Sequence, residues 1–288
     1  MALPPVLPPL VEVIARHALT ARRSLGQHFL LDPNLLARIV RAAGPLDGRH
    51  VIEVGPGPGG LTRALLDSPA ASVSVVEIDP RAVAAMQELA ALAGPRLRVI
   101  AADAVSLDLP SLVPPPRQIV ANLPYNVGTP LLIGWLRQAA AFERMTLMFQ
   151  QEVAERLAAA PDSADYGRLS VLAQWTCAVA IALRLPPSAF TPPPQVSSAV
   201  VSLLPHATQP EPALFATMER LTAAAFGQRR KMLRAALRGG LGAETAARLL
   251  AATGIDPTRR AETLSVAAFD RMARELAGYA AGTCISPR

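Results

Sequence analysis

Short apolar runs alternate with amphipathic helical patterns over the first half of the chain. Runs typical of buried strands occupy residues 50–55, 72–79, 97–103, 117–125 and 144–150. The intervening segment 79–94 begins with Asp79 and Pro80 and stops at Gly94, which is the usual signature of a capped helix. Strands that alternate with helices of this length predict a mostly parallel sheet covered by helices on both faces.

The periodicity changes towards the C-terminus. Residues 177–185 and 197–205 are strand-like, and we expect them to form an antiparallel pair, whereas 211–280 has helical periodicity only. We therefore predict an α/β chain in three parts. These are a flexible Pro-rich tail over 1–20, a Rossmann-like domain over 21–207 and a small all-helical domain over 208–288.

Composition places the chain among globular cytoplasmic proteins. Hydrophobic residues make up 51% of the 288 and charged residues 17%, which excludes a disordered chain. No apolar stretch reaches the ~18 residues of a membrane span, and no secretory leader is recognisable. Cys177 and Cys284 have neither CxxC spacing nor paired histidines. We therefore expect no metal site and no disulfide framework.

The net charge is +6, and nearly all of the positive charge is arginine, since Lys231 is the only lysine. A GC-rich genome accounts for most of this bias. Guanidinium groups also match phosphates bidentately, so the excess is weakly in favour of a polyanionic partner.

The segment "VIEVGPGPGGLT" (51–62) places Gly55, Gly57 and Gly59 between a strand and a helix. Glycines at such a turn let backbone N–H groups approach a ligand closely. Glu77 follows Gly55 by 22 residues, at the end of the next strand, where a carboxylate accepts hydrogen bonds from ribose hydroxyls. A dinucleotide and S-adenosylmethionine both carry a ribose, so these residues leave the two ligands open.

The third and fourth strands end in further polar groups. Asp103 can accept a hydrogen bond from an adenine amine, or it can simply cap the following turn. The fourth strand ends in Asn122, Leu123, Pro124 and Tyr125. The Asn122 amide oxygen and a backbone carbonyl of Leu123 or Pro124 can hold both hydrogens of an exocyclic amine, and Tyr125 can stack on a flipped base. This set favours methylation of an adenine amine over hydride transfer.

Several segments of the chain together resemble a known family. The segments that carry the likeness, in order, are "RRSLGQHFLLD", "VIEVGPGPGGLT", "VVEIDP", "ANLPYNVGTPLL", "FQQEVAERL", "YGRLSVLAQ", "PPSAFTPPPQVSSAVVSLLP", "FGQRRKMLRAAL" and "RAETLSVAAFDRMARELA". They closely resemble the bacterial small-subunit ribosomal RNA adenine dimethyltransferases, from about Arg22 to Leu276. The related erythromycin-resistance methyltransferases of 23S rRNA match the C-terminal segments less well.

The resemblance implies a Rossmann-like methyltransferase domain and an activity. The enzyme would transfer methyl groups from S-adenosylmethionine to two adjacent adenosines near the 3′ end of 16S rRNA. The products would be N6,N6-dimethyladenosine and S-adenosylhomocysteine. The partner would be 16S rRNA within the 30S subunit or its precursor, and the enzyme would be a cytoplasmic monomer with a role in small-subunit biogenesis. A mainly non-catalytic ribosome assembly factor is the alternative from another class.

The resemblance also assigns roles to individual residues. It places His28 and Leu30 at the methionine end of the donor, with Gly55 and Gly57 in the donor loop. Four further assignments are Glu77 on the ribose, Asp103 on the adenine, Asn122 between donor methyl and target amine, and Tyr125 with Phe190 sandwiching the target base. Gln195 and Ser197 stand where the family commonly has Lys and Asp, which puts local phosphate contacts in doubt.

A basic cluster follows in the C-terminal part. Its members, at helical spacings of three and four, are Arg229, Arg230, Lys231, Arg234 and Arg238. We expect a one-sided basic helix that contacts RNA phosphates, with an ordinary solvated helix face as the alternative.

Overall fold

The computed structural model describes residues 7–19, 28–228 and 230–282. The chain divides into two compact units. The first comprises Met1–Ala154 and Val179–Pro205, and the second comprises Glu155–Ala178 and His206–Arg288.

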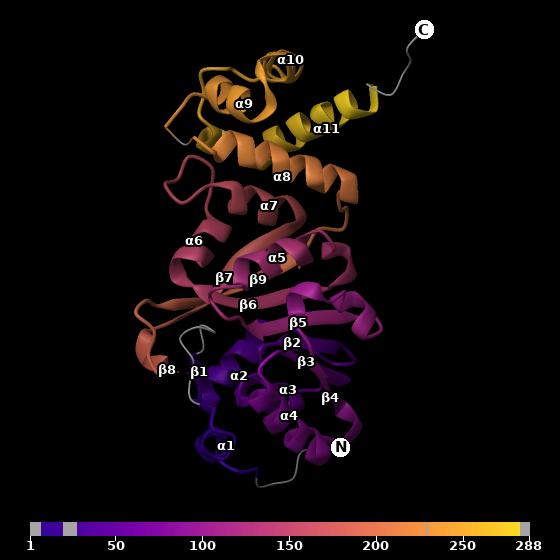
Figure 1. Cartoon of the computed structure of the whole chain (residues 1–288), viewed down its shortest axis with the longest axis vertical. Coiled ribbons are helices and arrows are strands. Elements are labelled where there is room, and N and C mark those ends of the chain that lie inside the picture. The colour runs from indigo at the N-terminus through magenta and orange to yellow at the C-terminus, as the bar shows by residue number, and fades with distance from the viewer. Residues whose placement is uncertain (1–6, 20–27, 229, 283–288) are drawn as a thin grey trace. The chain divides into compact units, whose positions relative to one another are not determined.

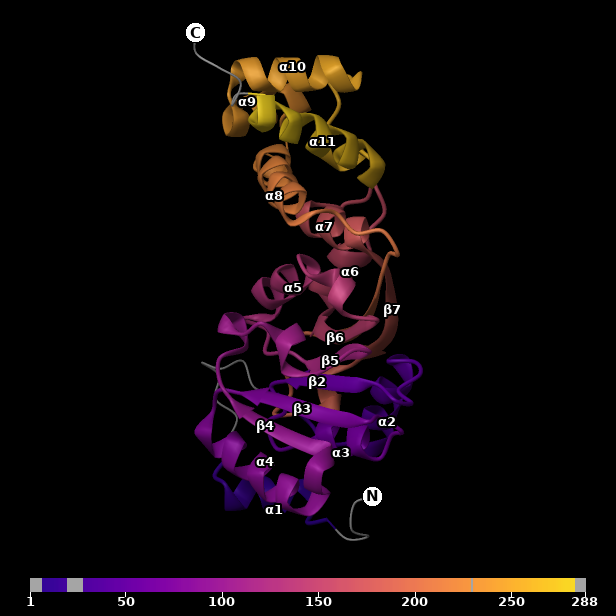
Figure 2. The same ribbon diagram turned by 90° about the vertical axis from the view of Figure 1, so that its right-hand side faces the viewer.

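The first unit is built on a seven-stranded sheet with the order β4-β3-β2-β5-β6-β9-β7. Its strands are β2 (His50–Val54), β3 (Ser72–Glu77), β4 (Leu97–Ala101), β5 (Arg117–Asn122), β6 (Arg144–Gln150), β7 (Cys177–Leu185) and β9 (Ser198–Pro205). Neighbours from β4 to β6 pair in parallel, and β9 runs antiparallel to β6. Figures 1 and 2 show β4, β3, β2, β5 and β6 stacked in this order. The predicted α/β fold class is confirmed.

Helices connect the strands of this sheet. They are α2 (Pro33–Ala42), α3 (Gly60–Leu66), α4 (Pro80–Ala93), α5 (Gly128–Leu136) and α6 (Gln151–Ala158). Asp32 and Asp79 cap α2 and α4 as expected, since their carboxylates accept from the N–H groups of Asn34 at 2.8 Å and of Arg81 at 3.1 Å. A separate antiparallel ribbon joins β1 (Phe29–Leu30) to β8 (Phe190–Thr191).

The N-terminal segment contains a helix, α1 (Leu10–Arg16). Val13 and Leu19 are buried, and Arg63 on α3 donates to the Pro8 carbonyl at 2.7 Å. The expected flexible tail over 1–20 therefore does not hold for residues 10–19, because they form a helix and its C-terminal turn, and Val13 and Leu19 pack into the core of this unit. Residues 1–6 and 20 lie outside the described part of the chain.

Among its described residues the second unit contains helices and their connecting turns, apart from Cys177 and Ala178, which begin β7. Its helices include α7 (Arg168–Thr176), α8 (Pro212–Phe226), α9 (Leu233–Leu241), α10 (Ala243–Thr253) and α11 (Val266–Gly282). Its core includes Phe269, which stacks on Phe226 with 5.5 Å between ring centroids. The indole N–H of Trp175 on α7 donates to Asp270 on α11 at 2.9 Å. Such contacts place Glu155–Ala178 in this unit, although the sequence pattern suggested one boundary near 207.

The basic cluster does not lie on one helix. Arg230 and Lys231 are in the turn before α9, Arg234 and Arg238 are on α9 itself, and Arg229 lies outside the described residues. The expected helix is interrupted at Met232, whose backbone is extended. There the N–H groups of Leu233 and Arg234 donate to the carbonyls of Arg259 and Pro257. Within the described chain, no helix is both long and apolar enough to cross a membrane.

Candidate active site

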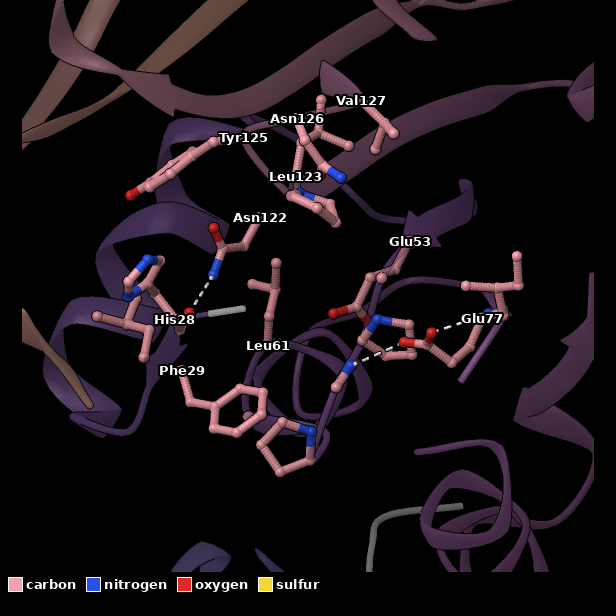
Figure 3. A pocket seen from close by; sticks show the side chains of 18 of the residues that line it. His28, Phe29, Glu53, Leu61, Glu77, Asn122, Leu123, Tyr125, Asn126 and Val127 are labelled. Atoms are coloured by element: carbon pink, nitrogen blue, oxygen red, sulfur yellow. Dashed lines mark hydrogen bonds between the residues drawn. The ribbon is translucent and has the colours of Figure 1, made fainter. Parts of the chain in front are cut away.

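A cavity of about 240 Å³ lies where β2, β3 and β5 end (Figure 3). Its wall includes residues 28–30, 55–58 and 122–127, together with Glu53, Glu77, Asp103 and several apolar side chains. The chain runs from β2 through β3 to β4 and then crosses to β5 on the other side of β2, so the strand order reverses between β2 and β5. Ligands of open α/β sheets bind at such a switch point.

The glycine loop after β2 forms one side of this cavity. Gly55 and Gly57 have φ values of +71° and +54°, which favour glycine. A Cβ on Gly57 would lie 3.1 Å from Cε1 of Phe29, and one on Gly55 would lie 3.5 Å from Cδ of Pro124. The loop is thus held close to both neighbouring segments, with its backbone next to the cavity.

Glu77 sits at the end of β3 with its carboxylate fixed by the backbone. Oε1 accepts from the N–H groups of Ile78 and Asp79, both at 2.8 Å, and Oε2 accepts from that of Gly57 at 3.4 Å. Burial raises the pKa of Glu77, while these three N–H groups oppose that rise. The side chain lines the cavity as a rigid hydrogen-bond acceptor.

Asp103 caps a turn and also faces the cavity. Its carboxylate accepts from the Val105 N–H at 2.9 Å and caps the turn Ala104–Ser106, and the residue also lines the cavity. Capping uses one oxygen and leaves further acceptor capacity for a ligand.

Asn122 ends β5 and faces the same cavity. Its amide Nδ2 donates to the His28 carbonyl at 3.4 Å, which directs the amide at the mouth of the site (Figure 3). The Pro124 carbonyl accepts from the N–H groups of Val127 at 3.2 Å and Gly128 at 3.1 Å. Because both lone pairs of Pro124 have partners, the Leu123 carbonyl is the better candidate for a second acceptor.

Tyr125 is held at the rim. Its hydroxyl lies 2.6 Å from Oγ of Ser198, and burial raises the pKa of the phenol. The ring of His28 stacks on Tyr125 with 5.6 Å between centroids, and His28 Nδ1 lies 2.9 Å from the Pro192 carbonyl. His28 and Leu30 both line the cavity, and their contact with the methionine end of the donor stays a prediction.

Phe190 is placed differently from what we expected. The residue is 3% exposed, packs in the hydrophobic core and is absent from the cavity wall. Its pairing with Leu30 in the β1–β8 ribbon accounts for this orientation. In this structure His28, and not Phe190, stacks on Tyr125.

Sequence reasoning missed Glu53, which lies on β2 and lines the cavity. The residue is 1% exposed, and burial raises the pKa of its carboxyl to about 8. The available signal was a lone acidic residue within the apolar run "VIEVG". A charge in a buried strand costs free energy and therefore points to a specific role.

The sheet order, the glycine loop at the switch point and the acid on the neighbouring strand define a Rossmann-like domain whose cavity suits a ligand with a ribose. Residues 18–278 match the family described as Ribosomal RNA adenine dimethylase, and the chain belongs to that family. This confirms the resemblance found in the sequence.

Two relatives share the name "Ribosomal RNA small subunit methyltransferase A". The one from Gluconobacter oxydans is 61% identical over 93% of this chain and 87% of its own length. The one from Paramagnetospirillum magneticum is 58% identical over 94% of this chain and 95% of its own length.

Two solved structures are similar in fold. A dimethyladenosine transferase from Plasmodium falciparum has a TM-score of 0.74 and 26% identity, covering 88% of this chain and 98% of its own. The 23S rRNA methyltransferase ErmE has a TM-score of 0.61 and 27% identity, and the match covers 86% of this chain and 99% of ErmE.

Proposed function

We propose that the protein transfers methyl groups from S-adenosylmethionine to N6 of two adjacent adenosines near the 3′ end of 16S rRNA. The observation that carries this proposal is that Asn122, Tyr125 and Glu77 line one cavity. The 61% identity to a protein named as a small-subunit methyltransferase supports it. The cytoplasm, where 30S subunits are assembled, would be the place of action.

The cavity suits the donor on chemical grounds. Glu77 offers an oriented acceptor for ribose hydroxyls, Asp103 an acceptor for the adenine amine, and the glycine loop a stretch of backbone next to the cavity. His28 and Leu30 would hold the methionine end. When bound, S-adenosylmethionine supplies an electrophilic methyl group on its sulfonium, and S-adenosylhomocysteine is the product.

The chain's own contribution to the reaction is orientation. The Asn122 amide oxygen and the Leu123 carbonyl would accept the two N6 hydrogens, which favours a pyramidal nitrogen with its lone pair aimed at the methyl group. Pro124 keeps this turn rigid because its ring fixes φ. We assign no general base, since the nitrogen becomes acidic once methylated and can lose its proton to water.

The target base would stack on Tyr125. In that case either the His28 ring moves aside, or the base enters on the other face of Tyr125. Phe190 would have to leave the core to complete a sandwich, so we keep its role as a prediction with that condition attached.

Two alternatives make different predictions. A 23S rRNA methyltransferase of the erythromycin-resistance type is favoured by the fold similarity to ErmE, but the 55–61% identical relatives are named for the small subunit. A non-catalytic assembly factor has no need for the oriented Asn122 and Glu77.

Labelled donor incubated with unmodified 30S and 50S subunits separates these possibilities. We expect label in 30S particles only. Label in 50S particles would favour the resistance-type enzyme, and binding to 30S without label would favour the assembly factor.

A further inference from the structure

Arg81 lies in the first turn of α4, four residues after Glu77, and the scheme above does not use it. Its guanidinium binds the carboxylate of Asp79, since Nε donates to Oδ1 at 3.0 Å and Nη2 donates to Oδ2 at 2.6 Å. Two parallel bonds to one carboxylate add geometric specificity as well as energy. The Asp79 side chain is 2% exposed and that of Arg81 20%, so removal of the guanidinium would take a counter-charge away from a buried carboxylate.

Asp79 is joined to Glu77 through the backbone of one short turn. The N–H groups of Ile78 and Asp79 both donate to Oε1 of Glu77 at 2.8 Å. The Asp79 side chain fixes this turn, because its Oδ1 also accepts the N–H of Arg81 at 3.1 Å and caps α4. The same turn therefore carries the ion pair with Arg81 and the two N–H groups that orient Glu77 in the cavity wall (Figure 3).

Charge links the two carboxylates as well. Burial raises the pKa of Glu77, and the negative charge of Asp79 adds to that rise. The guanidinium of Arg81, 2.6 Å from Asp79, balances this charge. Because an ionised carboxylate accepts stronger hydrogen bonds than a neutral one, the strength of Glu77 as an acceptor depends on the ion pair next to it.

The N-terminal segment holds the guanidinium from another side. Nη1 of Arg81 donates to the Ala18 carbonyl at 2.6 Å. Ala18 follows α1 and has a φ of +50°, a left-handed conformation that is unfavourable for alanine. Arg16, at the end of α1, forms a second and more exposed ion pair with Glu88 of α4 at 3.2 Å. All three nitrogens of the Arg81 guanidinium are thus engaged, which fixes its position.

We propose that Arg81 is a positioning residue for the donor, which through Asp79 holds the Glu77 carboxylate in the orientation that accepts ribose hydroxyls. Arg81 is absent from the described cavity wall, so it acts only through the two carboxylates. This inference rests on the proposed function, because it takes S-adenosylmethionine as the donor. It adds that donor affinity depends on a contact between α4 and the N-terminal segment.

A comparison of two ligands isolates this role. Competition calorimetry would measure the affinity of S-adenosylhomocysteine and of its 2′,3′-dideoxy analogue, which lacks the hydroxyls assigned to Glu77. We expect Arg81→Gln to weaken binding of S-adenosylhomocysteine about tenfold and binding of the analogue less than about twofold. A residue that only stabilises the fold would weaken both ligands alike, whereas an effect transmitted through Glu77 disappears with the hydroxyls.

Two control variants separate the ion pair from a general loosening of this unit. Glu88→Gln removes the exposed ion pair between α4 and α1. Arg96→Gln removes an arginine that donates to the Ser68 and Ala70 carbonyls, both at 3.0 Å, just before the start of β3. Both controls should bind the two ligands as the unaltered protein does.

Arg81→Lys is the conservative variant. It keeps the positive charge but cannot form the two parallel bonds. We expect a smaller loss of affinity than in Arg81→Gln, again confined to the ligand that carries the hydroxyls. Denaturant titrations show whether each variant is folded at the temperature of the binding experiment, and Arg81→Lys decides the question if Arg81→Gln does not fold.

Equal losses for the two ligands in a folded Arg81 variant, or undiminished affinity for S-adenosylhomocysteine, would overturn the proposal. Methylation of 30S subunits by the unaltered protein is measured in parallel. If the unaltered protein binds S-adenosylhomocysteine and methylates 30S subunits, a negative ligand comparison counts against the role of Arg81 alone. An unaltered protein that does not bind S-adenosylhomocysteine would contradict both this inference and the proposed function.

Discussion

Asn122 is the residue on which methyl transfer depends most directly. Its amide is oriented by the His28 carbonyl at the mouth of the cavity, while the donor contacts assigned to Glu77 and Asp103 come from other strands. Asn122→Ala should therefore leave donor affinity nearly unchanged and slow single-turnover methylation by at least ~100-fold. An unchanged single-turnover rate would remove Asn122 from the mechanism.

Gly57 is expected to tolerate no side chain. Its φ of +54° and the 3.1 Å approach of Phe29 mean that Gly57→Ala strains the loop beside the donor. We expect a loss of ~1–2 kcal/mol in unfolding free energy and about tenfold weaker donor binding. Gly48→Ala is the matched control, since Gly48 has φ +69° and nothing within 4 Å of an added Cβ. The control should lose stability but bind the donor normally.

Glu53 should make stability depend on pH without any ligand. Its pKa is raised from 4.5 to about 8 in the folded state, so the folded protein holds a proton that unfolding releases. Stability contributed by this group is complete below pH 4.5 and is lost as the pH rises towards 8. As the pH rises through this window, the unfolding free energy of the unaltered protein should fall, relative to that of Glu53→Gln, by about 1.4 kcal/mol per pH unit. Denaturant titrations at pH 5.5, 6.5 and 7.5 measure the difference, and a constant gap would contradict the account.

Sequence reasoning located residues whose chemistry follows from a position after a strand. Gly55, Glu77 and Asn122 each end or follow an apolar run, and parallel strands bring those ends together. It did not anticipate that Phe190 packs in the core, because the pairing of β1 with β8 joins segments about 160 residues apart. It also passed over Glu53, whose importance depends on a burial that the local pattern does not display.

At the scale of elements, periodicity located the strands of the sheet, and the Asp–Pro starts located α2 and α4. The helix α1 was missed because a Pro-rich beginning resembles a free tail. The break before α9 was missed because helical spacing continues through Met232. That break is set by tertiary hydrogen bonds to Pro257 and Arg259, which local sequence does not encode.

Phe269 on α11 tests the packing of the helical unit. The side chain is fully buried and stacks on Phe226, so Phe269→Ala should cost ~3–5 kcal/mol of unfolding free energy. Phe269→Leu keeps most of the volume and should cost about 1 kcal/mol. Because no assigned donor residue lies in this unit, the affinity for S-adenosylhomocysteine should survive at temperatures where the alanine variant remains folded. Calorimetric unfolding and binding measure both effects.

At the scale of the whole molecule, the assigned donor residues and the described members of the basic cluster belong to different compact units. The assigned donor residues lie in the first unit, and Arg230, Lys231, Arg234 and Arg238 lie in the second. The helical unit also takes Glu155–Ala178 from the middle of the chain. The chain passes between the two units at residues 154, 178 and 205. Packing between distant helices decides the first two of these boundaries, so the composition shift along the sequence indicates only the one at 205.

Arg234 and Arg238, one turn apart on α9, should supply phosphate contacts to the 30S substrate. Replacing both by Ala should weaken 30S binding and lower the slope of log affinity against log salt by up to about two, leaving donor affinity unchanged. Arg220 and Arg271, also exposed in this unit, provide a control with the same loss of charge. Equal slopes for the two double variants would mean that α9 presents an ordinary solvated face.

The position of the methyl groups tests the central claim most directly. Unmodified 30S subunits would be incubated with the protein and S-adenosylmethionine, and the 3′ fragment of 16S rRNA mapped by mass spectrometry. The account predicts two methyl groups on N6 of each of two adjacent adenosines, and far fewer methyl groups after the same incubation time with Asn122→Ala. Methylation at another position, or of 23S rRNA in a parallel 50S sample, would contradict it.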